Sequence, residues 1–179
     1  GSEYKSVFAV ILGTGVGAGY SVNKKIIVGP NKLTGEWGQN PIPGPMDEYE
    51  KSVKRHCGRV GAVEVFLSGP GLENYYEHIT KTKISSRDIV SLYQENDSVA
   101  GEVMDVYFER IARSFSTFVN ILDPDVIVCG GGMSEIDEIY DEVPNRIIPY
   151  IASNFFLTPI VKATHGSSSG VRGAAHLWN

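Results

Sequence analysis

Two glycine clusters are the features of this sequence best suited to holding a charged ligand. The first is the stretch 13–19, Gly-Thr-Gly-Val-Gly-Ala-Gly, which comes directly after an apolar run over residues 7–12. A glycine turn can aim several main-chain N–H groups at one point and so bind phosphate. The Thr14 hydroxyl adds a further donor. A tight hairpin whose glycines only relieve strain is an equally good interpretation of this stretch.

The second cluster is Gly130, Gly131 and Gly132, which come after the short apolar run 126–129. A strand that runs through glycines into a helix lets a flat ligand lie against the backbone, with helix amides aimed at it. A tight connection without a ligand is the plainer alternative, and we favour the ligand. Ser134 and Asp137 are expected to cap the next helix, which should continue to about residue 151.

A third candidate is the segment 34–40, Thr-Gly-Glu-Trp-Gly-Gln-Asn, within the irregular stretch 30–45. A carboxylate, an indole and two amides are groups that bind hydroxyls by hydrogen bonds. The alternative is a solvated loop in which Trp37 folds back onto the core. The neighbouring segment 47–54 is highly charged and expected to be exposed.

The residues after the first cluster exclude two familiar nucleotide motifs. A dinucleotide fingerprint or a P-loop requires a helix directly after its glycines. Residues 20–28 instead have the pattern of a strand, a polar turn and a strand, and no Gly-Lys-Ser/Thr ending is present.

Composition narrows the class of protein. The chain has 179 residues, enough for one domain, and a net charge of −5 without a basic block, which argues against a nucleic-acid partner. No apolar run approaches the length of a membrane span. The two cysteines, Cys57 and Cys129, cannot form a disulfide framework, so we expect a cytoplasmic protein.

Periodicity predicts an α/β fold with a mixed sheet flanked by helices. The longest predicted helix covers residues 98–122, with Asp97 as its N-cap and an end imposed by Pro124. The expected strands are 7–12, 19–22, 25–28, 126–129 and 158–163, and the other expected helices are 63–67, 72–79, 86–95 and 171–178.

These motifs together resemble the ROK (repressor, ORF, kinase) family of sugar kinases, and the resemblance covers nearly the whole chain. The Glu-Trp-Gly and Gly-Val-Arg-Gly-Ala-Ala motifs are most similar to those of bacterial fructokinases that also take mannose. The matching stretches are 11–19, 35–41 (Gly-Glu-Trp-Gly-Gln-Asn-Pro), 67–71 (Leu-Ser-Gly-Pro-Gly), 120–128, 130–133, 165–166 and 170–175 (Gly-Val-Arg-Gly-Ala-Ala).

The resemblance implies an actin-like ATPase (hexokinase) fold and ATP-dependent, Mg²⁺-assisted phosphorylation of a hexose, either fructose or mannose. It also implies that the chain is the C-terminal domain alone and forms a homodimer. The catalytic Asp would belong to an N-terminal domain, so no catalytic residue is expected here and the fragment should be inactive alone. The alternatives are a non-catalytic, sugar-sensing regulator of the same family and a degenerate homologue.

The resemblance also assigns residues to the two substrates. By motif, glycines and a threonine hold ATP, while two acids and an amide accept hydrogen bonds from sugar hydroxyls. The expected ATP-binding residues are Gly13, Thr14, Gly15, Gly17, Gly131 and Gly132, and the expected sugar-binding residues are Glu36, Gln39 and Glu64.

The chain departs from the family at its zinc site. The family motif holds zinc with a His after Glu-x-Gly and with three Cys in Cys-x-Cys-Gly-x-x-Gly-Cys-x-Glu. Here Gln39, Arg55, Cys57 and Ala62 occupy those four positions, so we predict that the zinc is lost. Sugar binding can persist through Gln39, but Arg55 and packing around Ala62 must then order the loop.

Overall fold

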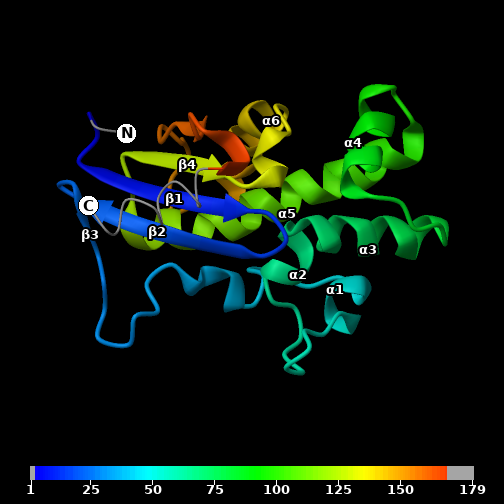
Figure 1. Ribbon diagram of the computed structural model, residues 1–179, viewed down its shortest axis with the longest axis horizontal. Helices are drawn as coiled ribbons and strands as arrows, with labels where there is room; N and C mark the ends of the chain where they lie inside the picture. Colours follow the sequence, from blue (N-terminus) through cyan, green and yellow to red (C-terminus); the bar gives the residue numbers. More distant parts are fainter. Residues whose placement is uncertain (1–2, 169–179) are drawn as a thin grey trace.

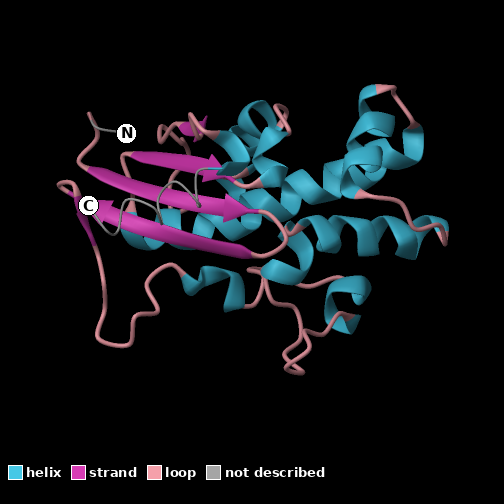
Figure 2. Cartoon of the chain, in the orientation of Figure 1, coloured by secondary structure: helices cyan, strands magenta, loops and turns pink. Residues whose placement is uncertain are grey.

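The computed structural model describes residues 3–168, whose elements are shown in Figures 1 and 2. The strands are β1 (Ser6–Leu12), β2 (Val16–Val22), β3 (Lys25–Ile26), β4 (Val126–Gly130) and β5 (Ile160–Lys162). The helices are α1 (Glu48–Ser52), α2 (Glu64–Leu67), α3 (Gly69–Thr80), α4 (Ser86–Gln94), α5 (Ser98–Leu122) and α6 (Ile139–Arg146). Four 3₁₀ turns are η1 (Glu36–Gln39), η2 (Gly132–Glu135), η3 (Ile148–Tyr150) and η4 (Gly166–Ser168). The predicted helix 171–178 lies outside the described residues.

The five strands form one mixed sheet in the order β3-β2-β1-β4-β5, which confirms the predicted class. β1 pairs antiparallel with β2, and Leu12 lies opposite Val16. β1 pairs parallel with β4, and Ile11 lies opposite Gly130. In Figure 1 the arrowheads of β1 and β4 point the same way, toward α3 and α4. Both glycine clusters therefore lie at one edge of the sheet, the edge where open α/β sheets bind ligands.

Helix α5 forms as the sequence predicts. The Asp97 carboxylate caps it by accepting a hydrogen bond from the Ala100 N–H at 2.8 Å. It ends at Leu122, and Asp123 then adopts a left-handed conformation before Pro124. Its apolar stripe packs against the sheet, where Phe118 stacks on Phe8 with ring centroids 4.1 Å apart. None of the helices in residues 3–168 is both long and apolar enough to cross a lipid bilayer.

Helix α3 begins earlier than predicted, and its first residues are fastened to the first glycine cluster. Ser68 caps it, since its hydroxyl oxygen accepts a hydrogen bond from the Gly71 N–H at 3.2 Å, and Pro70 lies in the first turn. The Gly69 N–H donates to the Gly13 carbonyl at 2.9 Å. Glycine and proline, which suggested a break, instead begin a helix because proline is favoured in a first turn.

The predicted capping pair after the second cluster is wrong. The Ser134 hydroxyl donates to the Gly131 carbonyl at 2.7 Å and is buried, so it closes the turn η2 instead of capping a helix. Helix α6 starts at Ile139 without a side-chain cap and ends at Arg146. Beyond Arg146 the chain continues only as the 3₁₀ turn η3, because Pro149 has no N–H to donate to the Asn145 carbonyl.

The charged segment 47–54 is not simply exposed, as the sequence suggested. Asp47 and Glu50 form a capping box that starts α1. Glu50 is only 1% exposed, and its carboxylate accepts from Arg110 Nε at 2.9 Å and from Arg113 Nη1 at 3.1 Å. Two arginines of α5 thus draw one acid of the segment into the interior.

Candidate functional site

A cleft of about 880 Å³ lies at the carboxyl edge of β1 and β4. One wall comes from the first glycine cluster and from η2, and the other from the start of α3 and from α4. Gly13, Thr14 and Gly132 line it, and so do Val90, Met133 and Ile136, which give it an apolar surface. A flat apolar group and a charged group could therefore be bound side by side.

The two glycine clusters meet at this cleft. The Gly132 amide nitrogen lies 4.0 Å from where a Cβ on Gly13 would stand. Gly15, Gly17 and Gly131 do not line the cleft: Gly15 faces Glu64, Gly17 faces the Gly35 carbonyl and Gly131 faces the Leu12 carbonyl. Of the six expected ATP-binding residues, the structure thus brings three together at the cleft.

The turn of the first cluster combines both interpretations of its sequence. The Gly13 N–H donates to the Gly15 carbonyl at 3.0 Å, as in a tight hairpin. Within the described part of the chain, the amides of Thr14 and Gly15 donate to no protein acceptor and remain available to an anion. None of the glycines in 13–19 has a positive φ, and only a Cβ on Gly15 would come closer than 3.9 Å to another atom, Glu64 Oε2. Neither backbone strain nor crowding within the protein therefore requires glycine at positions 13, 17 and 19.

Sequence reasoning missed the α4 wall of the cleft. Helix α4 begins at residue 86 as predicted, with Ser85 as its cap, and the Ser86 N–H donates to Glu73 Oε1 at 2.9 Å, which ties α4 to α3. Arg87 and Gln94 then face the cleft from this wall. The Ser-Ser cap was visible in the sequence, but nothing local in it shows that the helix lies opposite Gly13.

The candidate sugar-binding residues Gln39 and Glu64 are joined by one arginine. Arg55 Nη2 pairs with Glu64 Oε1 at 2.6 Å, and Arg55 Nη1 donates to Gln39 Oε1. Glu64 Oε2 accepts from the Val16 N–H at 3.1 Å, directly after the glycine turn. A continuous polar network therefore runs from the candidate phosphate turn to Gln39.

Glu36 and Trp37 differ in their surroundings. Glu36 is exposed and lines, with Gln39, a separate hollow between η1, the sheet and the end of α5. Trp37 is 7% exposed and packs edge-on against Phe115 and Phe118, with ring centroids 5.8 and 5.4 Å apart. The indole therefore packs into the core, as the alternative interpretation of this segment held.

The residues at the family's zinc positions do not fit a zinc ion. Ala62 offers no ligand atom, and the guanidinium of Arg55 is a permanent cation that is bound to Gln39 and Glu64. Among residues 3–168 no group of three His, Cys, Asp or Glu side chains is arranged to hold a metal. That the protein carries no zinc remains a prediction.

The two thiols should differ sharply in reactivity. A hydrogen bond from the Arg59 backbone and the charges of Arg55 and Arg59 lower the pKa of exposed Cys57, whereas burial raises the pKa of Cys129 to about 12. A lower pKa means more thiolate at neutral pH, so we expect Cys57 alone to react rapidly with Ellman's reagent. Loss of the fast phase in Cys57→Ser is the check, and a fast phase from Cys129 would contradict it.

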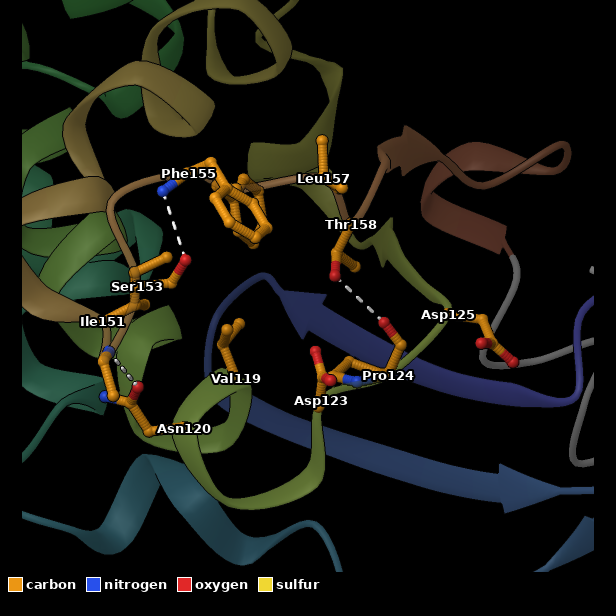
Figure 3. Close-up of a pocket in the computed structure, with 12 residues that line it drawn as sticks. Val119, Asn120, Asp123, Pro124, Asp125, Ile151, Ser153, Phe155, Leu157 and Thr158 are labelled. Atoms are coloured by element: carbon orange, nitrogen blue, oxygen red, sulfur yellow. Dashed lines mark hydrogen bonds between the residues drawn. The ribbon is translucent and has the colours of Figure 1, made fainter.

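A second hollow, of about 600 Å³, lies at the opposite end of β4 (Figure 3). It is bordered by the turn 123–125 and by the segment 151–158, where Thr158 Oγ1 donates to the Pro124 carbonyl at 3.1 Å. Because this is the amino edge of the parallel strands, the carboxyl-edge cleft is the better candidate site.

Comparison with known proteins identifies the family of the chain. The ROK family profile matches residues 1–179. The N-acetyl-D-glucosamine kinases of Vibrio atlanticus (strain LGP32) and Vibrio cholerae are each 38% identical to the chain, over 176 and 179 residues. These matches cover 96% and 98% of the chain but 58% and 59% of the two relatives, so the chain spans under three fifths of their length.

Solved structures support the fold. A ROK family glucokinase from Streptomyces griseus, in complex with glucose and AMPPNP, superposes with a TM-score of 0.84 at 20% identity and covers 98% of the chain and 61% of its own. The ROK hexokinase from Thermus thermophilus gives a TM-score of 0.81 at 21% identity, covering 97% and 56%. The fold is therefore the actin-like ATPase fold of these hexokinases.

Proposed function

The chain belongs to the ROK family, and from this premise we propose that it is the nucleotide- and sugar-binding C-terminal half of an ATP-dependent hexose kinase. The observation that carries the proposal is the single sheet edge where both glycine clusters border a cleft, linked to Gln39 through Val16, Glu64 and Arg55. The names of the curated relatives and the AMPPNP bound to the Streptomyces glucokinase support the same reaction class.

Each substrate has its own contacts. The free amide and the hydroxyl of Thr14, which lines the cleft, bind the phosphates of ATP, and the surface of Val90, Met133 and Ile136 holds the base. Glu36, Gln39 and Glu64 accept hydrogen bonds from sugar hydroxyls. Mg²⁺, when bound, neutralises charge on the phosphate oxygens. The base that takes the hydroxyl proton is supplied by an N-terminal domain, which this chain binds, and the protein is a cytoplasmic homodimer.

An activity assay with each candidate sugar identifies the substrate. The relatives named as N-acetyl-D-glucosamine kinases make that sugar the first candidate, while the Glu-Trp-Gly and Gly-Val-Arg-Gly-Ala-Ala motifs favour fructose or mannose. We expect the gene product with its upstream residues to release ADP with one of these, and the 179-residue chain alone to release none. Absence of ADP release with every hexose would defeat the proposal, and sugar binding without turnover would point to a regulator.

Gly13→Ala should weaken ATP binding without unfolding the chain. Its Cβ would stand in the cleft, no closer than 4.0 Å to any of its nearest atoms, so the fold has room for it while ATP does not. One extra methyl in a binding site costs roughly tenfold, and we expect about that rise in KM for ATP in the full-length kinase. Gly19→Ala, where the added Cβ meets nothing within 4 Å, is the matched control and should leave this KM unchanged.

A further inference from the structure

We infer that Arg55 is a positioning residue of the sugar site and does by hydrogen bonds what a metal ion would otherwise do. This inference rests on the proposed function. Its guanidinium holds Gln39 on η1 and Glu64 on α2 at a fixed separation, so that both face the sugar together. Within residues 3–168, the Gln39 side chain has no hydrogen-bond partner besides Arg55. The Glu64 side chain has only one further partner, the Val16 N–H.

The contact geometry fits this role. Arg55 uses one terminal nitrogen for Gln39 and the other for Glu64, and the rigid planar fork of a guanidinium fixes the two acceptors relative to each other. The side chains of Arg55 and Glu64 are 12% and 24% exposed, so the pair is shielded from water more than a surface ion pair. Glu64 still keeps lone pairs for a hydroxyl, because each carboxylate oxygen can accept twice.

The backbone that carries Arg55 is itself ordered without a metal. The Arg55 N–H donates to the Arg59 carbonyl and the Gly58 N–H to the Arg55 carbonyl, both at 2.8 Å. Lys54 and Val60 form an antiparallel bridge, and Gly58 turns the chain with a φ of +83°. This small hairpin presents Arg55 to Gln39 and Glu64 in one orientation.

The same hydrogen-bond network reaches the glycine turn of the first cluster. A Cβ on Gly15 would stand 3.0 Å from Glu64 Oε2, the oxygen that accepts from the Val16 N–H. Glu64 is held on its other oxygen by Arg55 and has little freedom to withdraw. The Val16 N–H thus keeps Glu64 next to the glycine turn, and Arg55 sets the position of its other oxygen relative to the sugar.

Kinetics of the full-length kinase test the positioning role. Hydrogen bonds to a charged group have effects of the size of a tenfold change or more, so Arg55→Ala should raise KM for the sugar about tenfold and KM for ATP less than about twofold. The sugar KM of Arg55→Lys should lie between those of the wild type and Arg55→Ala, because a single ammonium group replaces the two terminal nitrogens of the guanidinium. Lys54→Ala removes a neighbouring exposed charge and should change neither constant.

A double-mutant cycle separates positioning from general damage. If Arg55 acts through Glu64, then Arg55→Ala should raise the sugar KM far less in a Glu64→Gln background than in the wild type. Equal effects of Arg55→Ala in both backgrounds would overturn the inference. So would a variant in which kcat falls, both KM values rise together and the melting temperature drops.

Two measurements do not depend on kinase activity. Metal analysis of the purified wild-type protein should find far less than one zinc per chain, and trypsin should cut after Arg59 several-fold faster in Arg55→Ala than in the wild type. Stoichiometric zinc, or an unchanged cleavage rate, would overturn the role of Arg55 as the link between the two segments. If both results hold but no hexose is phosphorylated, the link stands while the proposed function and its sugar site fall.

Discussion

Glu50→Ala is expected to destabilise the chain by about 3–5 kcal/mol, the effect of removing one partner of a buried ion pair. Glu50 and Arg110 are 1% and 2% exposed, and their Oε1 and Nε atoms lie 2.9 Å apart. Without the carboxylate, Arg110 would keep only the exposed Asp47 Oδ2, 3.5 Å from its Nη2, and would face Arg113 with no shared anion. Urea unfolding of the 179-residue chain, followed by circular dichroism, measures the change.

The aromatic surroundings of Arg110 explain why water does not relieve this loss. Its guanidinium lies over the rings of Tyr75 and Phe66, with 4.2 and 5.1 Å to their centroids, and these contacts would remain in the variant. They favour a cation but supply no acceptor for its N–H groups.

An exposed ion pair in α1, the helix that also contains Glu50, provides the control. Glu48 and Lys51 form an ion pair at 2.7 Å, but their side chains are 92% and 57% exposed. Glu48→Ala should therefore change the unfolding free energy by less than about 1 kcal/mol. A loss in Glu50→Ala no larger than in Glu48→Ala would show that the buried pair is not what holds the segment to α5.

The comparison of these two acids shows where sequence reasoning stopped. Glu48 and Glu50 lie in one charged run, and composition predicts a solvated surface for both. Only the register of α5, which turns Arg110 and Arg113 toward this run, distinguishes them. The register depends on packing between segments about 60 residues apart, which no local pattern carries.

Other features were predictable because their causes are local. The apolar run of β1, the capped and periodic α5 and the glycine turns were all identified from neighbouring residues, and pairing of β1 with β4 then placed both turns at one edge. Two features could not be predicted in this way: the α4 wall, and the link from Arg55 to Gln39 and Glu64. Each of them joins segments that share no local sequence pattern.

Gly131→Ala should destabilise the chain by about 3–5 kcal/mol, because a strained backbone and a steric overlap each contribute on the order of 1–3 kcal/mol. Gly131 has φ 91° and ψ 170°, a conformation that only glycine adopts without strain. A Cβ there would also overlap the carbonyl oxygen of Leu12 on β1. The glycine is therefore needed where β1 and β4 meet at the cleft, before any ligand is considered. Chemical unfolding provides the measurement.

Two alanine variants separate the reasons for which glycine occurs here. Gly101→Ala in α5, where an added Cβ meets nothing within 4 Å, should stabilise the chain by roughly 0.5–1 kcal/mol. Gly132→Ala also meets nothing within 4 Å, yet its Cβ would enter the cleft, so stability should hold while ATP binding weakens. If Gly131→Ala instead folds as stably as Gly132→Ala and loses only ATP, then the second cluster serves the ligand at both positions and the backbone argument is wrong.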